Sequence, residues 1–207
     1  MNIFRHSVGI ASAQRGYSLV EISVALAIIA VILVGGLMGT RHVLLTNSVN
    51  GQIRETSTVI TKLQRQYAKQ PNTVGASTAI LAPLSIWPAE RTSAVNGVWT
   101  VRGVLSGSTE HVFSNDAAIG NLPVNSGFIY TLRQIPVDAC SELVTSLDSM
   151  AYALYTGVTA VAPTSGATPS TTVVKAAESN QVDLAKLAEG CKPNNANAVD
   201  VAVVLRQ

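Results

Sequence analysis

Residues 16–40 read GYSLVEISVALAIIAVILVGGLMGT, and this stretch decides how the rest of the chain is interpreted. From Ile22 to Thr40 it carries no charged side chain, and Ser23 and Thr40 are its only hydroxyl residues. As a helix, about 19 residues rising ~1.5 Å each extend roughly 28 Å, which is close to the hydrocarbon thickness of a bilayer. The sequence therefore predicts a membrane-spanning helix near the N-terminus.

Two simple interpretations of this helix leave features unexplained. A cleaved secretory signal has an apolar region of about 7–15 residues that ends in a small-residue cleavage site. Here the run is longer and passes into Arg41, His42 and Val43 without such a site. A plain signal anchor does not account for Glu21, a carboxylate at the edge of the run, where an ionisable group is costly. Nor does it account for a basic, acid-free segment that ends in Gly16.

The sequence RGYSLVE at residues 15–21, followed by the apolar run, resembles the processing site of type IV prepilins. In that family a membrane-embedded peptidase cuts after the glycine on the cytoplasmic side and methylates the new N-terminus. The resemblance implies cleavage between Gly16 and Tyr17, with Tyr17 becoming N-methylated. Tyrosine departs mildly from the residues usual at that position. The leader of residues 1–16 has the length typical of the type IVb branch.

Glu21 has a physical reason to be present beside the cleavage site. A lone carboxylate in hydrocarbon is costly and persists if it meets a cation. Cleavage frees the α-amino group of Tyr17, one helical turn away, and the resemblance implies that Glu21 pairs with this amine of a neighbouring subunit during assembly. The alternative is a glutamate that lies in the headgroup zone in contact with water.

The helical pattern continues beyond the apolar run. Residues at alternating spacings of four and three form an amphipathic seam, namely Val49, Ile53, Thr56, Ile60, Leu63 and Tyr67. Pro71 ends the pattern. We therefore expect one helix over residues 17–70, roughly 80 Å long, with a transmembrane and assembly half at 17–40 and an amphipathic half at 41–70.

The remaining residues, 71–207, predict a globular α+β head with an antiparallel sheet. Strand patterns occur at 98–105, 110–113, 127–133 and 198–205, and helical patterns at 136–150 and 182–189. Residues 162–172 read as a polar surface loop. By resemblance the fold is the pilin fold, in which a long N-terminal helix packs on the head and residues 71–88 connect the two.

Cys140 and Cys191 are the only thiols in the chain. Everything after the span would lie outside the cytoplasm, where disulfides persist, so a disulfide between them is expected. Closing a loop of about 50 residues stabilises by roughly 4 kcal/mol in the chain-entropy model. The segments DACSEL at 138–143 and LAEGCK at 187–192 resemble the two ends of the disulfide-bounded region of type IVb pilins such as the bundle-forming and toxin-coregulated kinds. Two unpaired buried thiols are the alternative.

Composition argues against several other classes of function. The chain has 14 Lys and Arg against 12 Asp and Glu, a balance that does not indicate a nucleic-acid binder. The three histidines and two cysteines lack the spacing of metal ligands, so we expect no metal and no cofactor. Four carboxylates could in principle supply acid–base chemistry, namely Glu110, Asp116, Asp138 and Asp148. No catalytic triad or phosphate-binding loop accompanies them, and we interpret His111 as an ordinary surface histidine.

The resemblance implies a structural subunit of a type IVb pilus and no catalytic residue. The helix would hold the processed subunit in the inner membrane as a single-pass protein with its head outside the cytoplasm. The subunit would then polymerise by helix packing into a surface filament, a homo-oligomer that serves adhesion, aggregation, motility or conjugation. Its partners would be the prepilin peptidase and the pilus assembly machinery. The alternatives are a minor pilin, a tip adhesin or a type II secretion pseudopilin, and more remotely a membrane-anchored periplasmic enzyme.

Overall fold

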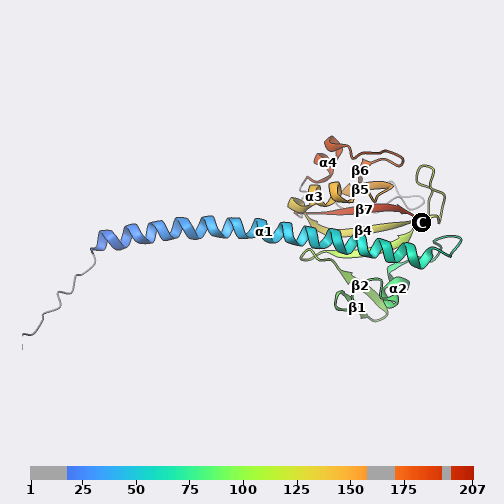
Figure 1. Ribbon diagram of the computed structural model, residues 1–207, viewed down its shortest axis with the longest axis horizontal. Coiled ribbons are helices and arrows are strands. Elements are labelled where there is room, and N and C mark those ends of the chain that lie inside the picture. Colours follow the sequence, from blue (N-terminus) through green and yellow to red (C-terminus); the bar gives the residue numbers. More distant parts are fainter. Residues whose placement is uncertain (1–17, 158–170, 193–196) are drawn as a thin grey trace, which may run out of the picture. The chain divides into compact units, whose positions relative to one another are not determined.

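The structure is a computed structural model that describes residues 18–157, 171–192 and 197–207. The chain divides into two compact units, with the boundary between Val43 and Leu44. Helix α1 (Leu19–Tyr67), drawn in blue to cyan in Figure 1, contributes residues to both units. Each unit is described by itself below.

The first unit consists of the apolar part of α1. Its residues Leu19–Gly36 have a mean hydropathy of 2.6, and none of them is buried. By length and composition this segment is able to cross a membrane. It is apolar around its whole circumference, as expected for a helix that lies in lipid or among other helices.

The second unit contains the amphipathic part of α1, and the seam predicted from the sequence packs there. Val49, Thr56, Ile60 and Leu63 are buried, while Ile53 and Tyr67 are half-buried. The helix ends at Tyr67, three residues before the predicted end at Gln70. Gln70 precedes Pro71, which disfavours helical backbone, and its N–H turns back to the Tyr67 carbonyl at 2.8 Å.

A seven-stranded sheet, antiparallel throughout, forms the centre of the second unit, as predicted (Figure 1). Its order is β1-β2-β3-β4-β7-β5-β6. The strands are β1 (Thr92–Val95), β2 (Val98–Arg102), β3 (Thr109–Ser114), β4 (Gly127–Pro136), β5 (Ala153–Gly157), β6 (Thr171–Lys175) and β7 (Ala198–Arg206).

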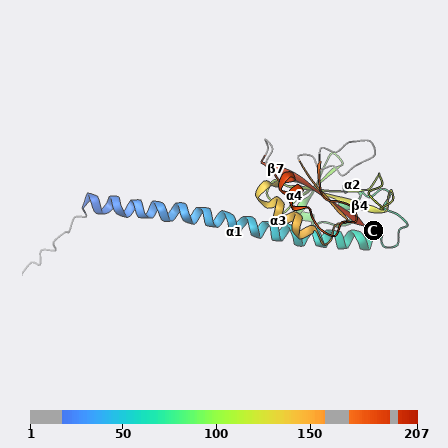
Figure 2. The ribbon, with the colours of Figure 1, turned by 90° about the horizontal axis from the view of Figure 1, so that it is seen from above.

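Both faces of the sheet are packed. Helix α3 (Val137–Leu147) and the second half of α1 cover one face of the sheet (Figure 2). On this face alternate residues of β4 and β7 belong to the main core. On the other face a smaller core joins β4, β5 and β7 to Ile119 and Leu122 of the β3–β4 connection. The central strand β7 is therefore buried on both sides, which explains its nearly continuous run of valine and alanine.

The short helices lie at the edges of the sheet. Helix α2 (Thr78–Leu81) and the 3-10 turns η1 (Ala82–Leu84) and η2 (Ala89–Arg91) belong to the connection between α1 and β1. Helix α4 (Leu184–Gly190) is capped by Asp183, whose carboxylate accepts hydrogen bonds from the Ala185 and Lys186 amides of the first turn. Gly190 lies against Thr156, where a Cβ would come 1.8 Å from the hydroxyl oxygen, so only glycine fits there.

Several elements differ from those predicted. Strands β1, β5 and β6 and helix α2 were not expected, and Thr171 and Thr172 belong to β6 although the sequence placed them in a loop. The rest of that predicted loop lies outside the described residues. Strand β2 ends at Arg102 because Gly103 begins a tight turn, in which its N–H bonds the Ser108 carbonyl at 2.8 Å.

Candidate functional site

Glu21 lies in the first turn of α1, where the positive end of the helix dipole favours a negative side chain. Among the described residues its carboxylate makes no ion pair or hydrogen bond. The neighbouring Ser23 hydroxyl instead donates to the Val20 carbonyl at 2.8 Å. Gly16 and Tyr17, the predicted processing residues, lie outside the described residues. The Glu21 carboxylate is thus available for a cation that this part of the chain does not supply.

The apolar surface next to Glu21 is large and uncovered. Leu26, Val31, Ile32 and Leu33 each have more than half of their surface exposed, with Val31 at 75%. An apolar surface of this extent marks contact with a membrane or another protein. This segment therefore requires a lipid or helical environment that the other described residues do not provide.

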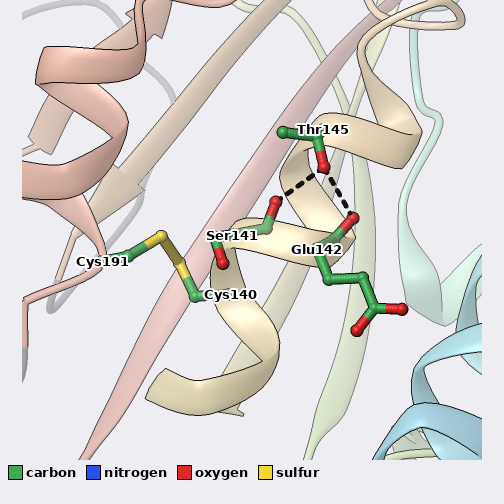
Figure 3. The surroundings of a disulfide bond; sticks show 5 residues. All are labelled: Cys140, Ser141, Glu142, Thr145 and Cys191. Carbon is green, nitrogen blue, oxygen red and sulfur yellow. Dashed lines mark hydrogen bonds between the residues drawn. A yellow bond between two sulfur atoms is a disulfide. The ribbon is translucent and has the colours of Figure 1, made fainter.

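The predicted disulfide is confirmed, and the alternative of two unpaired thiols is wrong. Cys140 of α3 is bonded to Cys191, just after α4, with a Cα–Cα distance of 5.8 Å (Figure 3). Cys140 is fully buried, and the cross-link closes a loop with a sequence separation of 51. One turn further along α3, the Thr145 hydroxyl donates to the Ser141 and Glu142 carbonyls. The bond thus joins α3, which packs on the sheet, to α4 beside the β6 edge.

A second polar feature joins α1 to the sheet, and we call it the Glu110 cluster. It consists of Gln52 and Glu55 of α1, Trp87 and Arg91 of the α1–β1 connection, Glu110 of β3 and Tyr130 of β4. Glu110 is fully buried, and its two carboxylate oxygens accept four hydrogen bonds.

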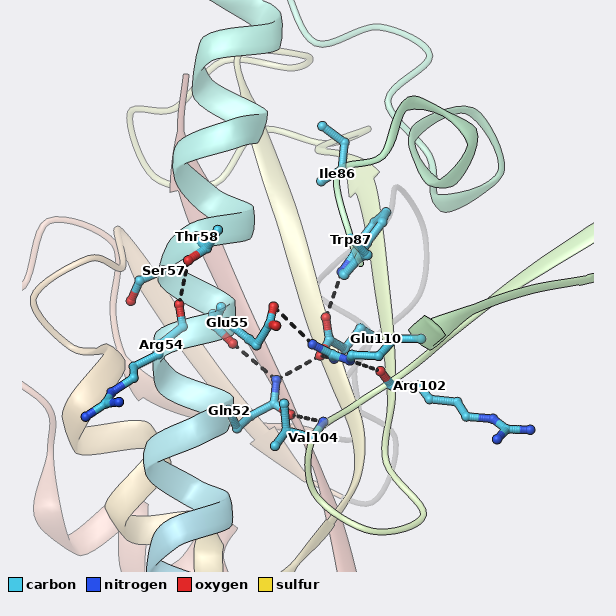
Figure 4. Close-up of polar contacts among 12 residues, drawn as sticks. Gln52, Arg54, Glu55, Ser57, Thr58, Ile86, Trp87, Arg102, Val104 and Glu110 are labelled. Carbon is cyan, nitrogen blue, oxygen red and sulfur yellow. Dashed lines mark hydrogen bonds and ion pairs between the residues drawn. The ribbon is translucent and has the colours of Figure 1, made fainter. Parts of the chain in front are cut away.

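The four hydrogen-bond donors to Glu110 come from three parts of the chain: α1, the α1–β1 connection and β4. Gln52 Nε2 donates to Oε1 at 2.9 Å and Trp87 Nε1 donates to Oε2 at 2.7 Å (Figure 4). The Arg91 guanidinium and the Tyr130 hydroxyl complete the set. Burial, and then the adjacent carboxylate of Glu110, raise the pKa of Tyr130 well above its usual value, so this hydroxyl remains a donor.

Most other groups of the cluster also have partners, although the buried Arg91 Nη1 has an ion pair with Glu55 and no hydrogen bond. Arg91 pairs with Glu55 at 3.1 Å and donates through Nε to the Arg102 carbonyl at 2.8 Å. The Gln52 carbonyl oxygen accepts the Val104 amide at 2.7 Å. A buried charge persists only when it is paired and fully hydrogen-bonded. The arrangement joins α1, the connection and the sheet to one another, and both carboxylate oxygens of Glu110 are occupied by hydrogen bonds from the chain itself.

The four carboxylates considered from the sequence do not gather into one site. Asp148 pairs with Lys175 at 2.9 Å, whereas Asp116 and Asp138 are exposed on separate elements. Over the described residues, no group of three His, Cys, Asp or Glu side chains could hold a metal ion. The role of Glu110 was not predicted, because its partners lie far from it in sequence. The one available signal is that Glu110 alternates onto the same face of its strand as Val112, and an acid that is buried with that face requires a cation.

Comparison with known proteins agrees with this description. Residues 11–37 match the family model of the prokaryotic N-terminal methylation motif. No curated protein matches the chain. The crystal structure of a type IV b pilin from Salmonella typhi is similar at 15% identity with a TM-score of 0.53, over 76% of this chain and 99% of that one. TcpA, a type IV pilin from Vibrio cholerae El Tor biotype, is similar at 17% identity with a TM-score of 0.54, over 76% of this chain and 98% of that one.

These findings define the class of protein. The chain carries the N-terminal methylation motif of prokaryotic prepilins and has the fold of type IVb pilins, as its sequence predicted. The long helix, the antiparallel sheet and the Cys140–Cys191 disulfide are the features that carry this fold.

Proposed function

We propose that this chain is a structural subunit of a type IVb pilus, cleaved between Gly16 and Tyr17, N-methylated at Tyr17 and polymerised through its N-terminal helix. One observation carries the proposal. The matched methylation motif, residues 11–37, runs into an exposed apolar helical segment, and the chain continues into a head of pilin fold.

The proposed domain organisation follows the predicted processing. Residues 1–16 form the leader that is removed. Residues 17–70 form the long helix, with the membrane and assembly part at 17–40 and the amphipathic part at 41–70, and residues 71–207 form the head. Before assembly the helix holds the subunit in the inner membrane with the head outside the cytoplasm. The prepilin peptidase and the inner-membrane assembly machinery are the partners.

Assembly is driven by the surfaces that the subunit leaves uncovered. The exposed side chains of Leu19–Gly36 pack against the same segment of other subunits when they leave the lipid. Glu21 receives the Tyr17 amine of a neighbour, because a carboxylate and an ammonium that leave water separately would each cost several kcal/mol. Removal of Arg5 and Arg15 with the leader leaves 12 basic and 12 acidic residues (14 minus 2, against 12), and this neutrality favours close packing of many copies.

Mass spectrometry of the protein from its native cell tests the proposal most directly. We expect an N-terminal peptide that begins with monomethylated Tyr17. A chain that begins at Met1, or after an alanine of the leader, would refute the processing. Immunogold labelling of sheared filaments then distinguishes the roles: label along their length supports a main structural subunit, whereas label at the tips alone indicates a minor pilin or adhesin.

A further inference from the structure

The outer face of the sheet, away from α1, has a hollow where β2 separates from β3. Only Val101 and Arg102 of β2 pair with β3. Further along β3, Ser77, which lies just before α2, forms an isolated β-bridge with Phe113 and takes the place of β2 beside that strand. The separation opens a cavity of about 540 Å³ between the β1–β2 hairpin, the start of α2 and the outer face of β3 and β4.

The walls of this hollow are mostly apolar. Val98 and Trp99 come from β2, Phe113 from β3 and Ala79 from α2. Val98 is 65% exposed, and Trp99 and Phe113 are half-buried. Val98 and Phe113 lie on the face of the sheet that borders this space, whereas the Trp99 side chain lies on the other face of β2 and packs against the main core. Cavities of this size and character are typical of sites for small molecules.

One full charge lies on the lining, and it is positive. The Nε atom of Arg133 pairs with Asp200 at 3.1 Å, and the Arg133 side chain is 47% exposed. Asp200 is itself buried and accepts the Gln134 amide at 2.9 Å through its other oxygen. Over the described residues the terminal nitrogens of Arg133 have no hydrogen bond, and no carboxylate lines the hollow. The ion pair therefore holds Arg133 at the hollow and leaves its two terminal nitrogens without a partner among the described residues.

The floor contains two further polar groups. Thr131 is 4% exposed, and its hydroxyl has no hydrogen-bond partner. A buried hydroxyl without a partner is rare and costs free energy. Beside it across the strand pair lies His111. Burial, and then the positive charge of Arg133, lower the pKa of His111, so near neutral pH it is an uncharged ring able to donate and to accept.

We propose that this hollow binds a small aromatic carboxylate, with the carboxylate on Arg133 and the ring against Val98 and Phe113. The geometry of a guanidinium matches a carboxylate with two parallel hydrogen bonds. A neutral apolar molecule would leave Arg133 unused, and a polyol such as an acidic sugar would bury its hydroxyls against apolar walls. A hydroxyl on the far side of the ring would reach the polar floor at Thr131 and His111. None of these residues belongs to the apolar segment proposed to drive assembly.

The affinity expected for such a ligand is modest. A compound of about 11 non-hydrogen atoms at ordinary ligand efficiency binds with a Kd on the order of 1 mM. Loss of the contact between carboxylate and guanidinium should weaken binding roughly 10- to 100-fold, since hydrogen bonds to charged groups are among the strongest in proteins.

The test uses the full chain in phosphatidylcholine nanodiscs, titrated with 4-hydroxyphenylacetate near neutral pH and followed by saturation-transfer NMR. Empty nanodiscs correct for partitioning into lipid. Tyrosol, which is neutral and otherwise nearly identical, and glucuronate, an acidic sugar, are titrated in parallel. We expect saturable binding of 4-hydroxyphenylacetate and at least about tenfold weaker binding of both comparators. Equal binding of tyrosol would overturn the role of Arg133, and equal binding of glucuronate would overturn the aromatic assignment.

Two variants locate the site. Arg133→Gln should remove the preference for 4-hydroxyphenylacetate over tyrosol. Arg102 is an exposed arginine of β2 that does not line the hollow, so Arg102→Gln should leave the preference unchanged. Because Arg133→Gln leaves Asp200 with fewer partners, circular dichroism checks its fold. If it does not fold, Arg133→Lys keeps the charge and should reduce affinity without abolishing the preference. Unchanged affinity in a folded Arg133→Gln protein would show that the ligand binds elsewhere.

Discussion

Glu110→Gln should destabilise the head strongly although it changes almost no volume. The substitution replaces an acceptor-only carboxylate with an amide that has one oxygen and one NH₂ group. In the folded protein all four hydrogen-bond partners of the Glu110 carboxylate are donors, from Gln52, Trp87, Arg91 and Tyr130. The amide NH₂ must therefore face at least one donor, and Arg91 loses one of its two negative partners.

The magnitude follows from burial. Glu110 is fully buried and Trp87 is 1% exposed, so water cannot replace the lost bonds without rearrangement. Breaking a buried ion pair by removing one partner costs about 3–5 kcal/mol. For a unit of this size, each kcal/mol lowers the melting temperature by about 2–4 °C. We therefore expect the head to melt roughly 6–20 °C below the unsubstituted protein.

Thermal unfolding followed by tryptophan fluorescence is a suitable assay because Trp87 belongs to the cluster. Glu90→Gln is the matched control: Glu90 is an exposed glutamate on η2, and its substitution should change stability by less than about 0.5 kcal/mol. If Glu110→Gln melts within about 2 °C of Glu90→Gln, the cluster contributes no more than a surface salt bridge and the reasoning is wrong.

Three further predictions concern other parts of the chain. Cys140→Ser should lower the free energy of unfolding by roughly 4 kcal/mol relative to the disulfide-bonded protein, as measured by urea titration, and leave insertion of the apolar helix unchanged. Thiol labelling of both cysteines in the denatured, unreduced native protein would contradict the bond. Glu21→Val should be processed and inserted normally but yield few sheared filaments relative to membrane-bound subunit, and normal filaments would return Glu21 to the headgroup interpretation. The pKa of His111 is lowered on folding, so the unfolded chain takes up a proton first as the pH falls. Stability should therefore decline below about pH 6.5, and His111→Gln should flatten that slope in urea midpoints measured at pH 5–8.

Much of the fold could be predicted because its signals are local. The alternation of Val199, Val201, Val203 and Leu205 in the last strand indicates a face that packs on a core, and all four contribute to the main core. The period of the α1 seam likewise depends only on the helix itself. The disulfide could be predicted because the sequence has only two cysteines and both are expected to lie outside the cytoplasm, where disulfides persist.

The elements that escaped prediction depend on their neighbours. Strand β1, TSAV, is a short edge strand whose burial pattern does not alternate, and its β-structure is defined by pairing with β2. The hollow on the outer face arises where β2 leaves β3, a feature of pairing that no periodicity encodes. Arg133 and His111 are separated by more than twenty residues and meet only because β3 and β4 are adjacent. His111, read as a surface residue, is in fact half-buried at the floor of that hollow.

The Glu110 cluster also explains how one position of α1 on the sheet is selected. Apolar contacts are non-directional, and the seam repeats at spacings of four and three, so a slip of α1 by one turn would place Ile53 where Val49 lies and still bury apolar surface. Gln52 cannot slip in this way, because its amide bonds both Glu110 and the Val104 amide. A slipped helix would leave the buried carboxylate short of a donor, at a cost of about 1–3 kcal/mol.

We therefore infer that the buried polar contacts set the register of the second half of α1, while the apolar seam supplies most of the attraction. Gln52→Leu tests this division, because it keeps a buried side chain of similar size and removes only the directional contacts. Amide hydrogen exchange should accelerate along residues 49–63 of α1 relative to the unsubstituted protein, while β7, which has its own ladders to β4 and β5, should remain protected. Equal acceleration in β7 would mean that the substitution loosens the whole head, and register would then not be what Gln52 controls.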